Sequence, residues 1–139
     1  ITMCVDLIKD GMNKYNLHHA IFQPSLTEPR FSSYIVFEGY SVDEEGRQYY
    51  LDAHVAYRMA CLEAINYLKS FGYTAEEAYM ILGTAPIEGR ISSIVDIPNA
   101  CCTLWLPTEI FEFDIRPRKE GPVRVVSGGR LPTARWEDR

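Results

Sequence analysis

One stretch of the chain, Ile94 to Pro107 (IVDIPNACCTLWLP), places an aspartate, an asparagine and two adjacent cysteines within an apolar run. A cysteine acts as a nucleophile when a neighbouring base or positive charge lowers the pKa of its thiol. A carboxylate within an apolar run is costly to bury unless it is paired, so it has either a structural partner or a function. The stretch therefore offers two kinds of candidate, the thiols of Cys101 and Cys102 and the polar side chains of Asp96 and Asn99.

The two adjacent cysteines are interpreted as packing residues. In a strand, Cys101 and Cys102 point to opposite faces, so at most one of them could serve a site. Cys102 would share its face with Leu104 and Leu106. The four cysteines show no CxxC or Cys/His finger spacing, which predicts reduced thiols, a cytoplasmic protein and no metal site within the chain. The three histidines, none of them near the cysteines in sequence, are His18, His19 and His54.

The polar residues around this stretch are the stronger site candidates. Glu88 and Arg90 flank Gly89 in what the pattern predicts is a turn leading into a strand. Asp96 has a structural partner or a role in a site, and the residues alone leave both open. Asn99, after Pro98, suits a turn and could also offer its amide to a ligand. No nucleophile elbow, Gly-rich phosphate loop or zinc motif completes a catalytic set.

The elements that would position these residues predict an α+β fold, with two packed helices against a small, mainly antiparallel sheet. Asp52 caps a helix with a wide apolar arc that ends before Gly72, and Thr74 and Glu77 form a capping box for a second helix over 75–82. β-branched and aromatic runs predict strands at 34–43, 89–98 and 100–107, and apolar alternation predicts an extended segment over 108–117.

The two ends of the chain differ from its middle. Residues 1–15 are amphipathic at helical spacing, and a helix that starts at residue 1 without an initiator Met predicts a segment of something longer. Residues 116–139 carry a net charge of +4 and the first 115 residues carry −9, for a total of −5. We expect residues 1–117 to form the folded portion, and residues 118–139 to form a basic Pro/Gly-rich tail ordered only if a partner holds it. No nucleic-acid or membrane partner is predicted.

Several pieces of the chain carry a resemblance to a known family. They are FEGYSVDE, AYRMACLEAINYLKSFGY, EEAYMILGTAPIEGRIS, IVDIPN and LWLPTEIFEFDI. Over roughly residues 5 to 117 the chain resembles the C-terminal portion of the acetamidase/formamidase family, and within it the formamidase branch. The resemblance implies the C-terminal part of a larger amidase fold that hydrolyses formamide or another short aliphatic amide to formate and ammonia.

The resemblance also implies what this chain would lack. The family's segments rich in His, Asp and Glu lie upstream, so this chain is expected to be inactive alone and to supply core, one wall of the site and subunit contacts. Its partners would be the missing N-terminal part of the same protein, the amide substrate and further copies in a homo-oligomer. The cofactor is left open, because the ligands of any divalent metal would lie outside this chain.

Within the matched stretch, the residues expected to line the site are Asp96 and Glu88 as catalytic groups and Asn99 as a substrate-binding group. A second hypothesis, from another class, is a non-catalytic stand-alone domain for interaction or oligomerisation. An open reading frame of this length and the absence of amidase activity would favour that second hypothesis.

Overall fold

The structure is a computed structural model that describes Leu7 and residues 9–16, 31–95 and 97–122. The chain divides into two compact units, residues 1–30 and 31–139. Most of the predicted tail, residues 123–139, lies outside the described residues. No helix in the described part of the chain has both the length and the apolar character needed to cross a membrane.

In the first unit, helix α1 is shorter than the sequence predicts. It spans Gly11–Tyr15 and begins after Asp10, which has a left-handed backbone (φ 59°) and no side-chain capping bond. Leu7 is not helical and Lys9–Asp10 form a turn, so the prediction of a helix running through these residues is wrong. None of the residues of α1 is buried. A helix without a packed face has little to offset its costly nucleation, which explains its short length.

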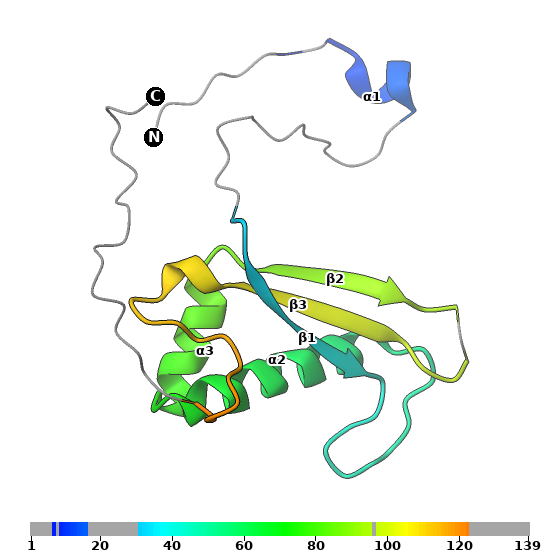
Figure 1. Cartoon of the computed structure of the whole chain (residues 1–139). Coiled ribbons are helices and arrows are strands. Elements are labelled where there is room, and N and C mark those ends of the chain that lie inside the picture. The colour runs from blue at the N-terminus through cyan, green and yellow to red at the C-terminus, as the bar shows by residue number, and fades with distance from the viewer. Residues whose placement is uncertain (1–6, 8, 17–30, 96, 123–139) are drawn as a thin grey trace, which may run out of the picture. The chain divides into compact units, whose positions relative to one another are not determined.

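The second unit contains a three-stranded antiparallel sheet in the order β1-β3-β2 (Figure 1). Strand β1 is Tyr34–Tyr40, β2 is Glu88–Ser93 and β3 is Cys101–Pro107. The predicted strand at 100–107 is confirmed, and the one predicted at 34–43 is present but ends at Tyr40. The predicted strand at 89–98 is shorter, because its pairing with β3 becomes irregular between Ile91 and Ser93 and ends there.

The prediction of a turn at Glu88-Gly89-Arg90 is also wrong. These residues form the first half of β2 and lie opposite Trp105, Leu104 and Thr103 of β3. This position of the strand requires a glycine because Tyr57 packs against it. A Cβ at Gly89 would lie 2.6 Å from the Tyr57 ring. Gly89 therefore marks a close approach of the sheet to a side chain.

One helix covers a face of the sheet, and a second helix packs against the first. Helix α2 (Ala53–Ser70) begins at Asp52, whose carboxylate accepts from the backbone N–H groups of His54 and Val55 at 2.9 and 3.0 Å. It ends before Gly72, whose φ of 90° is the left-handed conformation that glycine tolerates at this position. Helix α3 (Ala75–Thr84) begins with the predicted capping box and runs through Gly83, beyond the predicted end at Leu82.

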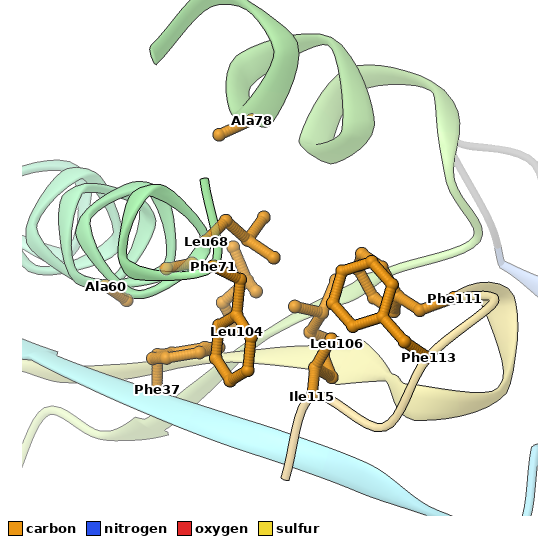
Figure 2. Close-up of a cluster of buried hydrophobic side chains, with 11 residues drawn as sticks. Phe37, Ala60, Leu68, Phe71, Ala78, Leu104, Leu106, Phe111, Phe113 and Ile115 are labelled. Carbon is orange, nitrogen blue, oxygen red and sulfur yellow. The ribbon is translucent and has the colours of Figure 1, made fainter. Parts of the chain in front are cut away.

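The core lies between the sheet and these helices. Figure 2 shows Leu68 of α2 and Phe71, the residue that follows this helix, packed with Leu104 and Leu106 of β3. Leu68, Leu104 and Leu106 are each 0% exposed. The other buried members of this cluster are Ala60 and Ala64 of α2, and Phe37, Ala78, Phe111, Phe113 and Ile115 from other segments.

The segment after β3 folds back on this core. Thr108–Ile110 form a short 3-10 helix, η1, so the predicted extended conformation does not hold for these three residues. Beyond it the predicted alternation is confirmed, since Phe111, Phe113 and Ile115 are buried. The Tyr67 hydroxyl of α2 donates to the Ile115 carbonyl and ties the segment to the helix.

Asp114 clamps the end of this segment. Its carboxylate accepts from the Arg116 guanidinium at 2.7 and 2.8 Å, from the Arg116 backbone N–H at 2.9 Å and from Arg118 at 2.9 Å. These bonds, those to the Arg116 side chain first, hold the pKa of the Asp114 carboxyl far below its ordinary value of 3.8.

We expect Asp114→Asn to destabilise the fold by about 1 kcal/mol or less at pH 7, because partly exposed ion pairs are weak. A depressed pKa contributes stability above the unfolded-state pKa of about 4, and that contribution is lost as the pH falls below it. The difference between wild type and variant should therefore shrink between pH 4 and pH 2. Urea unfolding of both proteins at several pH values measures this difference in unfolding free energy. A difference that does not change with pH would contradict the stabilising role of the ionised Asp114 carboxylate.

Candidate functional site

A hollow of about 540 Å³ lies beside the end of β1, where the chain leaves the sheet. Three segments that are distant in sequence contribute to it: the end of β1 with the loop after it, helix α2 and the loop before β3. The lining residues are Glu38, Gly39, Tyr40, Val42, Asp43, Met59, Glu63 and Asn99. The hollow therefore contains one of the residues that the sequence marked, Asn99.

Ser41 fixes the two loops against each other. It is 0% exposed, its N–H donates to the Ala100 carbonyl at 3.1 Å, and its hydroxyl accepts from the Ala100 N–H at 3.0 Å. The Gln48 side-chain amide donates to the carbonyls of Ser41 and Pro98 at 3.0 and 3.3 Å. These bonds hold the residue that precedes Asn99 in a defined place beside the end of β1.

Asn99 has a buried polar atom without a hydrogen-bond partner among the described residues. Its Oδ1 is shielded from solvent, and no donor reaches it. An unsatisfied buried acceptor costs about 1–3 kcal/mol, so such an atom needs an explanation. Asn99 lines the hollow, but its Oδ1 is not exposed there, so the hollow alone does not explain the unpaired carbonyl.

The electrostatics of the hollow favour hydrogen-bond donors and positive charge. Its carboxylates are Glu38 on β1, Asp43 in the following loop and Glu63 on α2. A hydrogen bond from the Arg47 backbone N–H to Asp43 Oδ1, 2.8 Å long, is the main cause that lowers the pKa of the Asp43 carboxyl. The negative charge of Glu38 raises the pKa of the neighbouring Tyr40 hydroxyl, which remains a neutral donor at neutral pH.

Glu88 lies elsewhere. It is opposite Trp105 at the far end of β3 from Asn99, and six residues of extended chain correspond to roughly 20 Å. Its carboxylate pairs with Arg90 at 2.6 Å, and the Arg90 guanidinium lies 4.0 Å from the centre of the Trp105 ring. The structure therefore does not bring Glu88 and Asn99 together. Asp96, in the connection between β2 and β3, lies outside the described residues.

The two cysteines of β3 lie on opposite faces, as predicted, and Cys102 is buried whereas Cys101 is partly exposed. Cys102 is 1% exposed and its thiol donates to the Ala53 carbonyl at 3.4 Å. Burial is the main cause that raises the pKa of both the Cys101 and the Cys102 thiols. A second hollow of about 290 Å³ is lined by His54 and Cys102 among others, yet the bond of the thiol goes to the backbone. Neither thiol is an activated nucleophile here.

The described residues hold no group of three or more His, Cys, Asp or Glu side chains that could bind a metal ion. The sequence reasoning missed Glu38, Asp43 and Glu63 as residues of the hollow, because they come from separate segments. One signal was present in FEGY: a glycine within a strand pattern indicates a close approach of two backbones, here at Gly39.

Comparison with known proteins identifies the class. The profile described as the Acetamidase/Formamidase family matches residues 1–113. The chain belongs to this family. This match confirms the resemblance found in the sequence, and the helices and antiparallel sheet confirm the predicted α+β fold.

Individual relatives carry narrower names. A formamidase from Methylophilus methylotrophus is 63% identical over 125 residues, which are 90% of this chain and 31% of that protein. An acetamidase from Mycolicibacterium smegmatis is 56% identical over 128 residues, 88% of this chain and 30% of that protein. The solved structure of a gamma lactamase from Delftia acidovorans is 60% identical with a TM-score of 0.81, covering 88% of this chain and 30% of that one. This chain thus spans about a third of the length of these relatives.

Proposed function

We propose that this chain is part of a formamidase-like amidohydrolase that converts formamide, or another short aliphatic amide, to formate and ammonia. The observation that carries the proposal is the 63% identity with a formamidase over 90% of the chain. The hollow beside β1 supports it, because its acidic residues Glu38, Asp43 and Glu63 can accept hydrogen bonds from the N–H groups of a small amide.

Amide hydrolysis needs an activated nucleophile or water, stabilisation of the tetrahedral oxyanion and a proton for the leaving nitrogen. We assign Asp96 the acid–base role and Asn99 the binding of the amide N–H, since they are three residues apart in one loop. Glu88 is the other carboxylate candidate. Formamide has only three heavy atoms, so Glu88 and Asn99 are alternative contacts of one substrate molecule and cannot both touch it.

The remaining catalytic groups are proposed to come from polypeptide that this chain does not include. A divalent metal, if the enzyme uses one, would be held by ligands from that polypeptide. A cytoplasmic location and a homo-oligomeric assembly complete the proposal. The described part of this chain would then contribute core, one wall of the site and subunit contacts.

The direct test is ammonia release by the assembled enzyme. The chain is co-expressed with the portion of the Methylophilus methylotrophus formamidase that lies outside the aligned segment, and the purified complex is assayed on formamide and acetamide. We expect release from at least one of them, and an increase in KM of about tenfold in Asn99→Ala because one hydrogen bond to the substrate is lost. A stable complex with no activity on any short aliphatic amide would refute the proposed function.

A further inference from the structure

Strand β1 is an edge strand whose outer side is open in the described part of the chain. In the order β1-β3-β2, only β3 pairs with it. Its sequence, YIVFEGY, contains no lysine or proline, the residues that most often protect a sheet edge. A seven-residue edge strand of this composition is a ready template for another strand.

The backbone geometry shows which residues of β1 face the open side. At the two ends of the strand, Thr108 N–H donates to the Ser33 carbonyl at 3.0 Å and Ser41 N–H donates to the Ala100 carbonyl at 3.1 Å. Hydrogen-bonding residues alternate along an antiparallel pair. The odd-numbered residues therefore bond to β3, and the N–H and C=O groups of Val36, Glu38 and Tyr40 point away from it.

Helix α2 forms a floor beside this open edge. A Cβ at Gly39 would lie 2.1 Å from the Ala56 carbonyl oxygen, so β1 sits almost directly on the helix backbone. Met59 and Glu63 of the helix line the hollow next to the strand. On the other face of the sheet, Val36 and Tyr40 remain 40% and 49% exposed. A strand added at this edge would cover Met59 on the α2 face of the sheet and Val36 and Tyr40 on the other face.

We propose that the free edge of β1 is a strand-addition site, and that its occupant is a β-strand from the part of an Acetamidase/Formamidase family member that this chain does not span. The relatives supply such polypeptide, because the chain covers only 30–31% of them. The added strand carries an apolar side chain over Met59. It also carries basic side chains on both faces, toward Glu38 on the outer face of the sheet and toward Glu63 on α2.

A second copy of this chain fits the edge less well. Two copies joined through β1 would bring two sets of these three carboxylates together, with a net charge of −5 on each chain. Like charges close to each other across paired strands are destabilising. The charge of the edge thus favours a partner strand with basic residues over self-association.

The test compares two variants of one outward-facing residue. Glu38→Pro removes an N–H that points away from β3, so the β1–β3 ladder keeps its bonds, whereas Glu38→Ala removes the carboxylate and keeps the N–H. Each variant is co-expressed with the part of the Methylophilus methylotrophus formamidase outside the aligned segment, and complex formation is measured by native mass spectrometry. We expect Glu38→Pro to weaken the complex on the order of tenfold more than Glu38→Ala.

Hydrogen exchange provides a measurement that does not depend on how the proline variant folds. In the wild-type complex, the amides of Val36, Glu38 and Tyr40 should exchange at least about tenfold more slowly than in the free chain. Unchanged exchange in the complex, or failure of the two polypeptides to associate, would overturn the proposal. Equal protection in a homodimer of the chain alone would also overturn it, by identifying a second copy as the occupant. None of these readouts depends on amidase activity.

Discussion

Gly39→Ala is expected to destabilise the fold by about 3 kcal/mol or more, the upper end of the range for overpacked sites. A Cβ at this position would lie 2.1 Å from the Ala56 carbonyl oxygen and 2.3 Å from the Ala60 backbone nitrogen. Backbone atoms in the middle of a helix cannot rotate away as a side chain can. The sheet and α2 would have to separate, and the core between them would lose its packing.

Gly83→Ala is the matched control for this substitution. Gly83 lies within α3, and a Cβ there meets nothing within 4 Å. The same added methyl group should therefore stabilise the protein by about 0.5–1 kcal/mol, because alanine loses less conformational entropy than glycine in a helix. Urea unfolding followed by tryptophan fluorescence measures both variants. Equal effects of the two substitutions would show that α2 does not approach β1 this closely.

Asp96→Asn is expected to lower kcat for formamide by about 100-fold or more in the assembled enzyme, with little change in KM. A side chain that transfers a proton in the transition state typically contributes a factor of about 100 to 10,000. The amide keeps the shape and most hydrogen bonds of the carboxylate and removes its proton-transfer ability. Steady-state kinetics of ammonia release measures the change, and unfolding of the variant chain shows whether the fold survives.

Glu88→Gln is the matched substitution in this case, because it makes the same chemical change at the second candidate carboxylate. The Glu88 carboxylate is half-exposed and already paired with Arg90, and we expect less than about a threefold change in kcat, since exposed ion pairs contribute little. A wild-type kcat in Asp96→Asn would remove Asp96 from the site. A large loss in Glu88→Gln with none in Asp96→Asn would move the site to the Trp105 end of the sheet.

The helices show which features of this fold can be predicted from local sequence. Asp52, Gly72 and the Thr74–Glu77 capping box each act through bonds to residues within a few positions, so the boundaries that they predict for α2 and the start of α3 are those observed. The amphipathic pattern of residues 1–15 had no such cap, and the helix found there has only five residues. A periodic pattern predicts a helix reliably only where a packed face or a cap stabilises it.

The strands show a second limit. Alternation placed Cys102, Leu104 and Leu106 on one face of β3, and all three are buried there. The place where β2 begins and ends depended on its partner, because pairing with β3 includes Glu88-Gly89-Arg90 and becomes irregular after Ile91. The side-chain pattern within one strand does not show how that strand pairs with its neighbour, so the register of β2 on β3 could not be predicted.

The sequence alone determined the α+β class, the two capped helices, the packing role of the cysteines and the family. These follow from local bonds, from side-chain periodicity and from long colinear similarity. The tertiary structure alone decided that Glu88 and Asn99 lie at opposite ends of β3, and that Asn99 shares a hollow with Glu38, Asp43 and Glu63. The reason is that the hollow is built from three segments: the close approach at Gly39 joins β1 to α2, and the hydrogen bonds between Ser41 and Ala100 join β1 to the loop of Asn99.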